Sequence, residues 1–230
     1  MKILILNGSP HLEKGSTGAV IAALEMGMQS AAPEITKRNI CSLDVKPCKG
    51  CFTCWSTTPG ECAQKDDMRE ILALIREADV LILATPVYVD GMTGSMKVAL
   101  DRMLPLVKGR VELRDDHMRH VPRSRAQTKL VLVSPSGFAE LDNFDPLVAH
   151  VKAAAKNLNY EYSGAVLVPG AWLMPRLPDV LEKTVRLIAK AGTELVEHGV
   201  IPPRVSEEIA AMVPREKVVE ALNRGYGRFE

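Results

Sequence analysis

The chain has 230 residues, of which 47% are hydrophobic and 25% are charged, as is usual for a globular protein with a buried core. Its 29 Lys and Arg residues nearly balance its 28 Asp and Glu residues, so no strong field draws it to nucleic acid or to an anionic membrane surface. No apolar run is long enough to span a bilayer, and the run near the N-terminus is too short for a signal peptide, so we expect a cytoplasmic protein.

The first third of the chain alternates between strand and helix patterns. The apolar run "KILILN" (2–7) ends in Asn-Gly and predicts a strand that is buried on both faces. Apolar residues then recur at helical spacing over 21–28, and "EITKRNI" (34–40) is a weaker candidate for a strand. Asp67 followed by Glu70 resembles a capping box. It opens a helix whose apolar face is formed by Ile71, Leu74, Ile75 and Ala78.

The alternation continues to about residue 200. "ADVLILATP" (78–86), "TKLVLVSPSG" (128–137) and "YSGAVLVPG" (162–170) predict three more buried strands. Helical stripes separate or follow them at 96–107, 147–158 and 181–195. Such alternation predicts an α/β fold with a parallel sheet covered on both faces. We expect one domain over 1–200, followed by a short helical extension over 201–230.

Four of the five cysteines crowd into a loop at 48–62. They are spaced Cys-x2-Cys-x2-Cys-x7-Cys and are Cys48, Cys51, Cys54 and Cys62. Structural disulfides are rare in the cytoplasm, so metal or redox chemistry is the leading interpretation. Three cysteines within seven residues favour an iron-sulfur cluster, while free thiols, a reversible disulfide and a zinc site are alternatives. Cys41 falls outside the spacing, and we expect it to be a buried apolar residue.

Three loops with unusual compositions leave the carboxyl ends of predicted strands, where open parallel sheets bind ligands. They are "NGSPHLEKGST" (7–17), "TPVYVDGMTGSMK" (85–97) and "SPSGFAELDNF" (134–144). The first supplies glycines, hydroxyl groups and a helix N-terminus, a combination that favours a phosphate site. It is not a P-loop, because Ser16 stands where that motif requires Lys. Each loop could also be an ordinary polar turn.

Together these three motifs resemble the flavodoxin-like NADPH-dependent FMN reductases over about residues 1–200. The resemblance implies a doubly wound five-stranded parallel sheet of order 2-1-3-4-5 and one non-covalently bound FMN. It implies that the FMN phosphate is held by Ser9, His11, Ser16 and Thr17. The isoalloxazine would lie along Pro86, Val87 and Tyr88, with Gly91 giving room for the backbone, and Ser136 and Gly137 would close the other side.

Within this family the cysteine loop resembles that of the iron-sulfur flavoproteins, which carry a [4Fe-4S] cluster beside FMN. The resemblance implies that Cys48, Cys51, Cys54 and Cys62 are the metal ligands. Trp55, directly after the third cysteine, departs from the pattern, and a related branch with this Trp need not bind a cluster.

The resulting hypothesis is an FMN-dependent oxidoreductase that carries a cluster and passes electrons from NAD(P)H or a reduced carrier to an acceptor. Its partners would be small-molecule or protein electron donors and acceptors, and it would be a homodimer or homotetramer. A cluster-free NAD(P)H-dependent FMN or quinone reductase is one alternative. A non-catalytic flavin electron carrier that docks on a partner is another.

The stretch "VELRDDHMRHVPRSRAQ" (111–127) is polar, and we expect a solvated loop. The alternative is a mobile cover near the flavin, in which an arginine contacts an NADPH phosphate. The candidates for that contact are Arg119, Arg123 and Arg125. We expect His117 and His120 to be surface residues rather than metal ligands.

Overall fold

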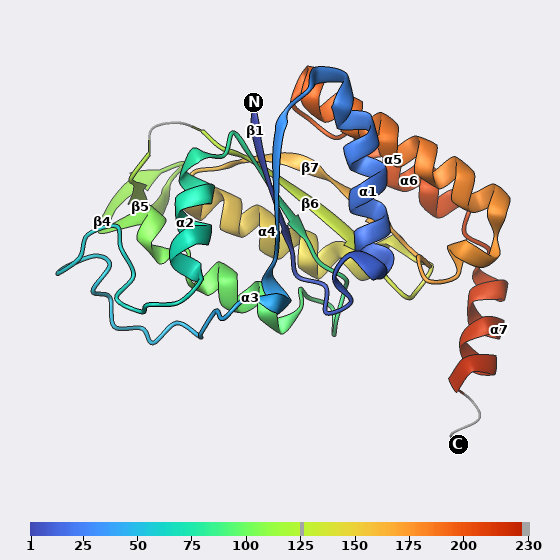
Figure 1. Cartoon of the computed structure of the whole chain (residues 1–230), viewed down its shortest axis with the longest axis horizontal. Helices are drawn as coiled ribbons and strands as arrows, with labels where there is room; N and C mark the ends of the chain where they lie inside the picture. Colours follow the sequence, from blue (N-terminus) through green and yellow to red (C-terminus); the bar gives the residue numbers. More distant parts are fainter. Residues whose placement is uncertain (125–126, 227–230) are drawn as a thin grey trace.

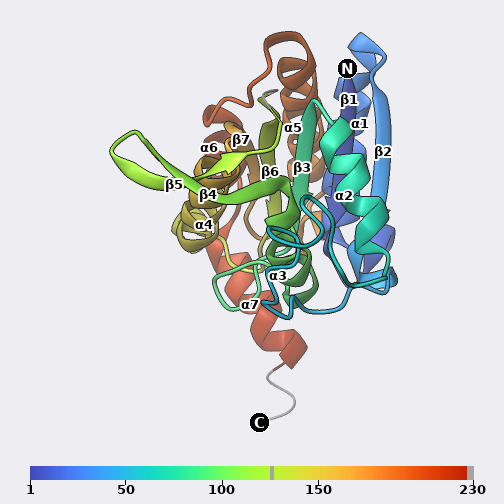
Figure 2. The same cartoon turned by 90° about the vertical axis from the view of Figure 1, so that its left-hand side faces the viewer.

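The computed structural model describes residues 1–124 and 127–226 and contains a five-stranded parallel sheet of order β2-β1-β3-β6-β7 (Figure 1 and Figure 2). Its strands are β1 (Lys2–Asn7), β2 (Glu34–Asn39), β3 (Val80–Ala84), β6 (Lys129–Pro135) and β7 (Glu161–Val168). When only these strands are numbered along the chain, the order is 2-1-3-4-5. The predicted flavodoxin-like sheet is therefore confirmed, including its weakest candidate strand, β2.

Helices cover both faces of the sheet, which explains why the inner strands β1 and β3 are continuous apolar runs. Ile3 and Ile5 of β1 pack toward α1 (Ser16–Met28) and α5 (Pro178–His198). Leu4 and Leu6 of the same strand pack in a second core on the opposite face. That core is formed with α2 (Met68–Glu77), α3 (Gly94–Asp101) and α4 (Asp145–Leu158). Because side chains alternate across a strand, two cores require an apolar residue at every position.

The C-terminal helices extend the α1–α5 layer. Val205 and Ile209 of α6 (Arg204–Ala211) join the core on that face. The next helix, α7 (Arg215–Tyr226), projects from the end of the molecule (Figure 1). Whether 201–230 forms a separate extension stays a prediction. Within the described residues, the helices all fall short of the length and apolarity that a membrane crossing requires.

The polar stretch after α3 is a β-hairpin and not the expected loop. β4 (Val107–Arg114) and β5 (His117–Pro122) pair antiparallel, and the hairpin projects from the body of the protein (Figure 2). Asp115 and Asp116 join the strands with positive φ angles of 54° and 56°, as a type I′ turn requires. The sequence does contain a signal for this hairpin, because apolar and polar residues alternate on both sides of Asp115 and Asp116.

Two local expectations about helices were wrong. Asp67 does not cap α2 through its side chain, because its carboxylate accepts a hydrogen bond from the backbone N–H of Asp44 at 2.8 Å instead. The stripe over 96–107 is not one helix, because α3 ends at Asp101. Pro105 then lies in a short 3-10 helix that leads into β4. The described 3-10 helices are Leu12–Lys14, Gln29–Ala31, Ile40–Ser42, Leu104–Leu106, Leu141–Phe144 and Met174–Arg176.

Candidate functional site

A cavity of about 630 Å³ lies at the carboxyl ends of the strands, and it is lined by the loops that follow β1, β3, β6 and β7 together with α1 and α5. Nine of the ten predicted cofactor-binding residues line it: Ser9, His11, Ser16, Thr17, Pro86, Val87, Tyr88, Ser136 and Gly137. The tenth, Gly91, is not part of the lining. Instead Gly91 exchanges two backbone hydrogen bonds with Tyr88, at 2.9 and 3.1 Å, and so fixes the turn that presents Tyr88.

Asn7 shapes the loop between β1 and α1. Its buried side chain accepts a hydrogen bond from the N–H of Ser9 at 2.9 Å and donates one to the carbonyl of Leu12 at 3.1 Å. The Ser9 hydroxyl in turn accepts from the N–H of His11 at 3.3 Å. α1 then begins after Gly15, and no described side chain caps it. The first N–H groups of α1 are therefore left for a ligand at the wall of the cavity.

Buried hydroxyl groups tie the strand-end loops to one another. The Thr93 hydroxyl donates to the carbonyl of Gly8 at 2.7 Å, and the Thr93 N–H donates to the Thr85 hydroxyl at 3.0 Å. The Ser134 hydroxyl donates to the carbonyl of Thr85 at 2.7 Å. Gly8 is required here, since a Cβ atom at this position would lie 2.8 Å from the Cβ of Met96. The loops after β1, β3 and β6 are thus held as one rigid wall.

Several lining residues were missed by the sequence analysis. Trp172 belongs to the loop after β7 and donates from Nε1 to the carbonyl of Gly137 at 3.0 Å. Ligands bind at the carboxyl ends of parallel strands, and the loop after β7 leaves such an end, so the same argument that selected the other three loops could have found it. Thr184 lies on α5, where its helical spacing is that of a core residue. It is buried, and among the described residues its hydroxyl has no hydrogen-bond partner.

The cavity fits a flavin nucleotide. Its volume falls in the usual range for small-molecule sites. The uncapped N-terminus of α1 beside Ser16 and Thr17 suits a phosphate group. The unpartnered Thr184 hydroxyl at the lining suits a polar group of the ligand, because a buried polar atom normally has a partner. The roles of individual residues in FMN binding stay predictions.

The four clustered cysteines line a second, small pocket together with Gln64 and Arg102. They lie in a long loop without a helix or strand between Ile40–Ser42 and α2. Cys48 and Cys51 are exposed, Cys54 is buried and Cys62 is half-buried. Burial raises the pKa of Cys54, and the neighbouring Cys62, Cys51 and Cys48 raise it further. A hydrogen bond with the Thr53 hydroxyl lowers the pKa of Cys51.

The spacing of these thiols does not suit a single metal ion. Over the described ranges 1–124 and 127–226, no three His, Cys, Asp or Glu side chains stand close enough to hold one ion. A four-iron cluster makes a different demand, because each thiolate binds its own iron corner and the sulfurs stand farther apart. The convergence of all four cysteines on one pocket fits that demand.

The hairpin anchors one side of the cysteine loop. Trp55 donates from Nε1 to the carbonyl of Leu104 at 3.0 Å, and its ring packs on His120 with centroids 4.6 Å apart. Arg123 donates to the carbonyl of Cys54 at 3.1 Å. Arg119 instead bonds Asn157 at 2.6 Å, and neither arginine lines the flavin-sized cavity.

These contacts correct the expectations for the hairpin residues. Arg119 and Arg123 do not line the large cavity, and Arg125 lies outside the described residues. His117 is exposed as expected, but His120 is half-buried against Trp55. Cys41 is half-buried and not fully buried, and its thiol donates to the carbonyl of Gly8 at 3.3 Å.

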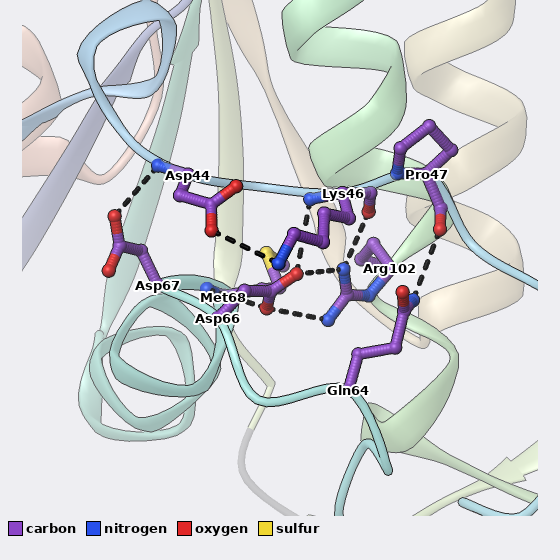
Figure 3. A network of polar contacts seen from close by, with 8 residues as sticks. All are labelled: Asp44, Lys46, Pro47, Gln64, Asp66, Asp67, Met68 and Arg102. Carbon is purple, nitrogen blue, oxygen red and sulfur yellow. Dashed lines mark hydrogen bonds and ion pairs between the residues drawn. The ribbon is translucent and has the colours of Figure 1, made fainter.

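A buried ion pair closes the other side of the loop (Figure 3). Arg102 holds Asp66 through two hydrogen bonds of 2.7 and 2.8 Å, and both side chains are at most 1% exposed. Arg102 also donates to the carbonyl of Lys46 at 2.6 Å, and Gln64 donates to the carbonyl of Pro47 at 3.1 Å. The hydrogen bond from Arg102 holds the pKa of Asp66 below its ordinary value. Both ends of the loop are thereby fixed to Arg102, the residue that follows α3.

The chain is similar to several iron-sulfur flavoproteins. One from Archaeoglobus fulgidus is 39% identical over 105 residues, which are 46% of each chain. One from Methanocaldococcus jannaschii is 35% identical over 106 residues, which are 46% of this chain and 53% of the relative. The chain thus spans about half the length of the curated relatives that it matches.

Solved structures share the fold at low sequence identity. An FMN-dependent NADH-azoreductase from Bacillus anthracis str. Ames Ancestor, in complex with FMN, has a TM-score of 0.64 at 16% identity and covers 85% of this chain and 99% of its own. RosB, with a bound riboflavin-phosphate derivative, has a TM-score of 0.62 at 17% identity, covering 100% of this chain and 88% of its own. The family model described as NADPH-dependent FMN reductase matches residues 1–122, which include the loops after β1 and β3 and the four clustered cysteines. Since that match covers more than half of the chain, the protein belongs to the NADPH-dependent FMN reductase family.

Proposed function

We propose that this protein is an FMN-dependent oxidoreductase that moves electrons between NAD(P)H, or a reduced carrier, and an acceptor through FMN and a [4Fe-4S] cluster. One observation carries the proposal: the predicted flavin residues converge on one cavity, and the four clustered cysteines converge on a second pocket. The family membership and the names of the relatives support the same assignment.

The large cavity would hold FMN through groups that the chain already orients. The N–H groups at the start of α1 and the hydroxyls of Ser16 and Thr17 would bind the phosphate without a P-loop lysine. Tyr88 and Trp172 offer flat rings at the lining, and Pro86 stiffens the exit from β3. When bound, FMN supplies the redox chemistry, since it accepts electrons in pairs and releases them singly.

The second pocket would hold the cluster through Cys48, Cys51, Cys54 and Cys62. Thiolates are the ligands that iron-sulfur clusters take, and a bound cluster carries single electrons. The contact of Trp55 with His120 and the bond from Arg123 to the carbonyl of Cys54 keep the loop in place. The ion pair of Arg102 and Asp66 holds its base.

A cluster-free NAD(P)H-dependent FMN or quinone reductase is the second candidate. It is favoured by the exposure of Cys51 and by the Thr53 hydroxyl that lowers the pKa of its thiol. An exposed thiol with a lowered pKa suits reversible disulfide chemistry. On this alternative the cysteine loop works as a thiol switch or has no redox role.

The test is the iron, sulfide and FMN content of protein purified without oxygen. We expect about four irons and four sulfides per FMN in the wild type. Cys48→Ala, Cys51→Ala, Cys54→Ala and Cys62→Ala should each lose most of the iron and keep FMN, because the two pockets are separate. Cys41→Ser is the matched control and should keep both, since Cys41 lies outside the cysteine pocket. A wild type without iron and sulfide would leave the cluster-free reductase as the assignment.

A further inference from the structure

Arg102 is a buried cation whose donors are only partly used. Its Nη1 atom donates to Asp66 and to the carbonyl of Lys46, and its Nη2 atom donates to Asp66 (Figure 3). Its Nε atom is buried, and among the residues that the structure describes it has no hydrogen-bond partner. A buried donor without a partner is costly, so its position is informative.

The unused donor belongs to a residue at the wall of the cysteine pocket. Arg102 lines that pocket together with Cys62 and the other three clustered cysteines. The polar atoms of Asp66 and Lys46 lie on the Nη side of the guanidinium, which leaves Nε for another acceptor.

We infer that Arg102 is the positioning residue of the cysteine site, and that its Nε–H donates a hydrogen bond to the Cys62 thiolate when that thiolate ligates the cluster. This inference rests on the proposed function, because it needs the cluster to be present. Asp66 compensates the buried charge and orients the guanidinium of Arg102, which lines the pocket. A thiolate accepts such a charge-assisted hydrogen bond well.

The hydrogen bond has a consequence for the reduction potential. Donors to the sulfur atoms of a cluster favour the reduced form, which carries one more negative charge, and therefore raise the potential. Removing the Nε–H while keeping a positive charge should lower the potential. A residue that only held the loop in place would not produce this shift.

Arg102→Lys makes this change. Lysine keeps the positive charge and can still pair with Asp66, but it has no second nitrogen that could donate as the Nε–H of arginine does. We expect its cluster to have a more negative midpoint potential than the wild type in an anaerobic titration followed by electron paramagnetic resonance. Iron per FMN and FMN affinity should stay at wild-type values. Arg38→Lys is the control, because Arg38 makes a similar pair with Glu70 on the surface and lies outside the cysteine pocket. It should leave the potential unchanged.

Asp66→Asn is the second variant, in case Arg102→Lys does not retain iron. It keeps Arg102 but removes its counter-ion, so the uncompensated positive charge should move the potential in the positive direction. A negative shift in Asp66→Asn would overturn the inference. So would the loss of iron from both variants with unchanged FMN affinity, because the pair would then only hold the loop.

The remaining outcomes separate the inference from the proposed function. A wild-type potential in an iron-loaded Arg102→Lys protein would overturn the inference and leave the cluster assignment intact. That result is also expected if Nε pairs with Gln64, whose Oε1 is the other unpartnered buried atom among the described residues of this pocket. A wild type without iron and sulfide would defeat both the cluster assignment and the inference.

Discussion

Each of the two pockets is lined by a residue with a buried polar atom that has no hydrogen-bond partner among the described residues. Among these atoms are the hydroxyl oxygen of Thr184 in the large cavity and Nε of Arg102 in the cysteine pocket. A buried polar atom that lacks a partner destabilises the folded chain, and such atoms are uncommon in native proteins. At a ligand site the ligand removes this cost. Substitutions of Thr184 and Arg102 should therefore affect ligand binding more than the stability of the ligand-free fold.

Thr184→Val should separate binding from stability. The FMN-free variant should be as stable as the wild type or slightly more stable, because it replaces an unpartnered hydroxyl with a methyl group. Its affinity for FMN should fall by about 1 kcal/mol, the net value of one hydrogen bond. The measurements are fluorescence titration of the FMN-free protein and its denaturant unfolding.

The matched control is Thr193→Val on the same helix. The Thr193 hydroxyl donates to the carbonyl of Gly27 at 3.1 Å, and Thr193 does not line the large cavity. It should therefore lose stability and keep FMN affinity. If Thr184→Val lost stability and Thr193→Val lost FMN affinity, the assigned roles would be reversed.

At the scale of elements, the contact between α1 and α5 determines how closely one face of the sheet is covered. Gly27 on α1 and Gly192 on α5 let the two backbones approach. A Cβ at Gly27 would lie 1.6 Å from the carbonyl oxygen of Ala189, and one at Gly192 would lie 2.2 Å from that of Leu24. The same two helices line the cavity: α1 carries the proposed phosphate site, and α5 carries Thr184.

Gly27→Ala should destabilise the protein by about 1–3 kcal/mol or more, the usual cost of inserting atoms into a packed contact. FMN affinity should fall as well, because the two helices that line the cavity are pushed apart. The comparison is Gly94→Ala at the start of α3, where a Cβ would have no neighbour within 4 Å. Denaturant unfolding of both variants gives the free energies, and equal values would contradict the packing argument.

At the scale of the whole molecule, the ion pair of Asp66 and Arg102 links the cysteine loop to the core of the fold. The hydrogen bond from Arg102 lowers the pKa of Asp66 from its unfolded value near 3.8. A carboxyl group whose pKa is lower in the folded state stabilises the fold fully above the unfolded pKa. That contribution is lost as the pH falls from about 3.8 through the lower folded pKa.

The free energy of unfolding should therefore fall as the pH decreases below about 4. Asp66→Asn should remove part of this dependence, and it should destabilise the protein at pH 7 by about 3–5 kcal/mol, because it leaves a buried cation without its counter-ion. Urea unfolding of the FMN-free protein at pH 7, 5, 4 and 3 measures both effects. The control is Glu70→Gln, which removes the exposed partner of Arg38 and should cost at most about 1 kcal/mol. A variant with the wild-type pH dependence would contradict the role of Asp66.

The sequence by itself determined the sheet, its order by family resemblance, and nine of the residues that line the large cavity. These features depend on local patterns. The apolar run of β1 and the Gly and Ser residues that follow it, for example, lie within residues 2–17. Parallel strands bring their carboxyl ends to one edge, so residues in separate loops could be grouped before any contact was known. The spacing of the cysteines likewise predicted a common site for Cys48, Cys51, Cys54 and Cys62.

Only the tertiary structure placed Thr184 at the large cavity and Arg102 at the cysteine pocket. Thr184 stands in α5 and Arg102 follows the last residue of α3, and helical periodicity does not distinguish a core residue from one that faces a ligand. Arg102 meets Asp66 across 36 positions of the chain, and Arg123 meets Cys54 across 69. Such contacts are set by how the hairpin and α3 pack against the cysteine loop. That packing depends on the three-dimensional fit of distant surfaces, which no local pattern contains.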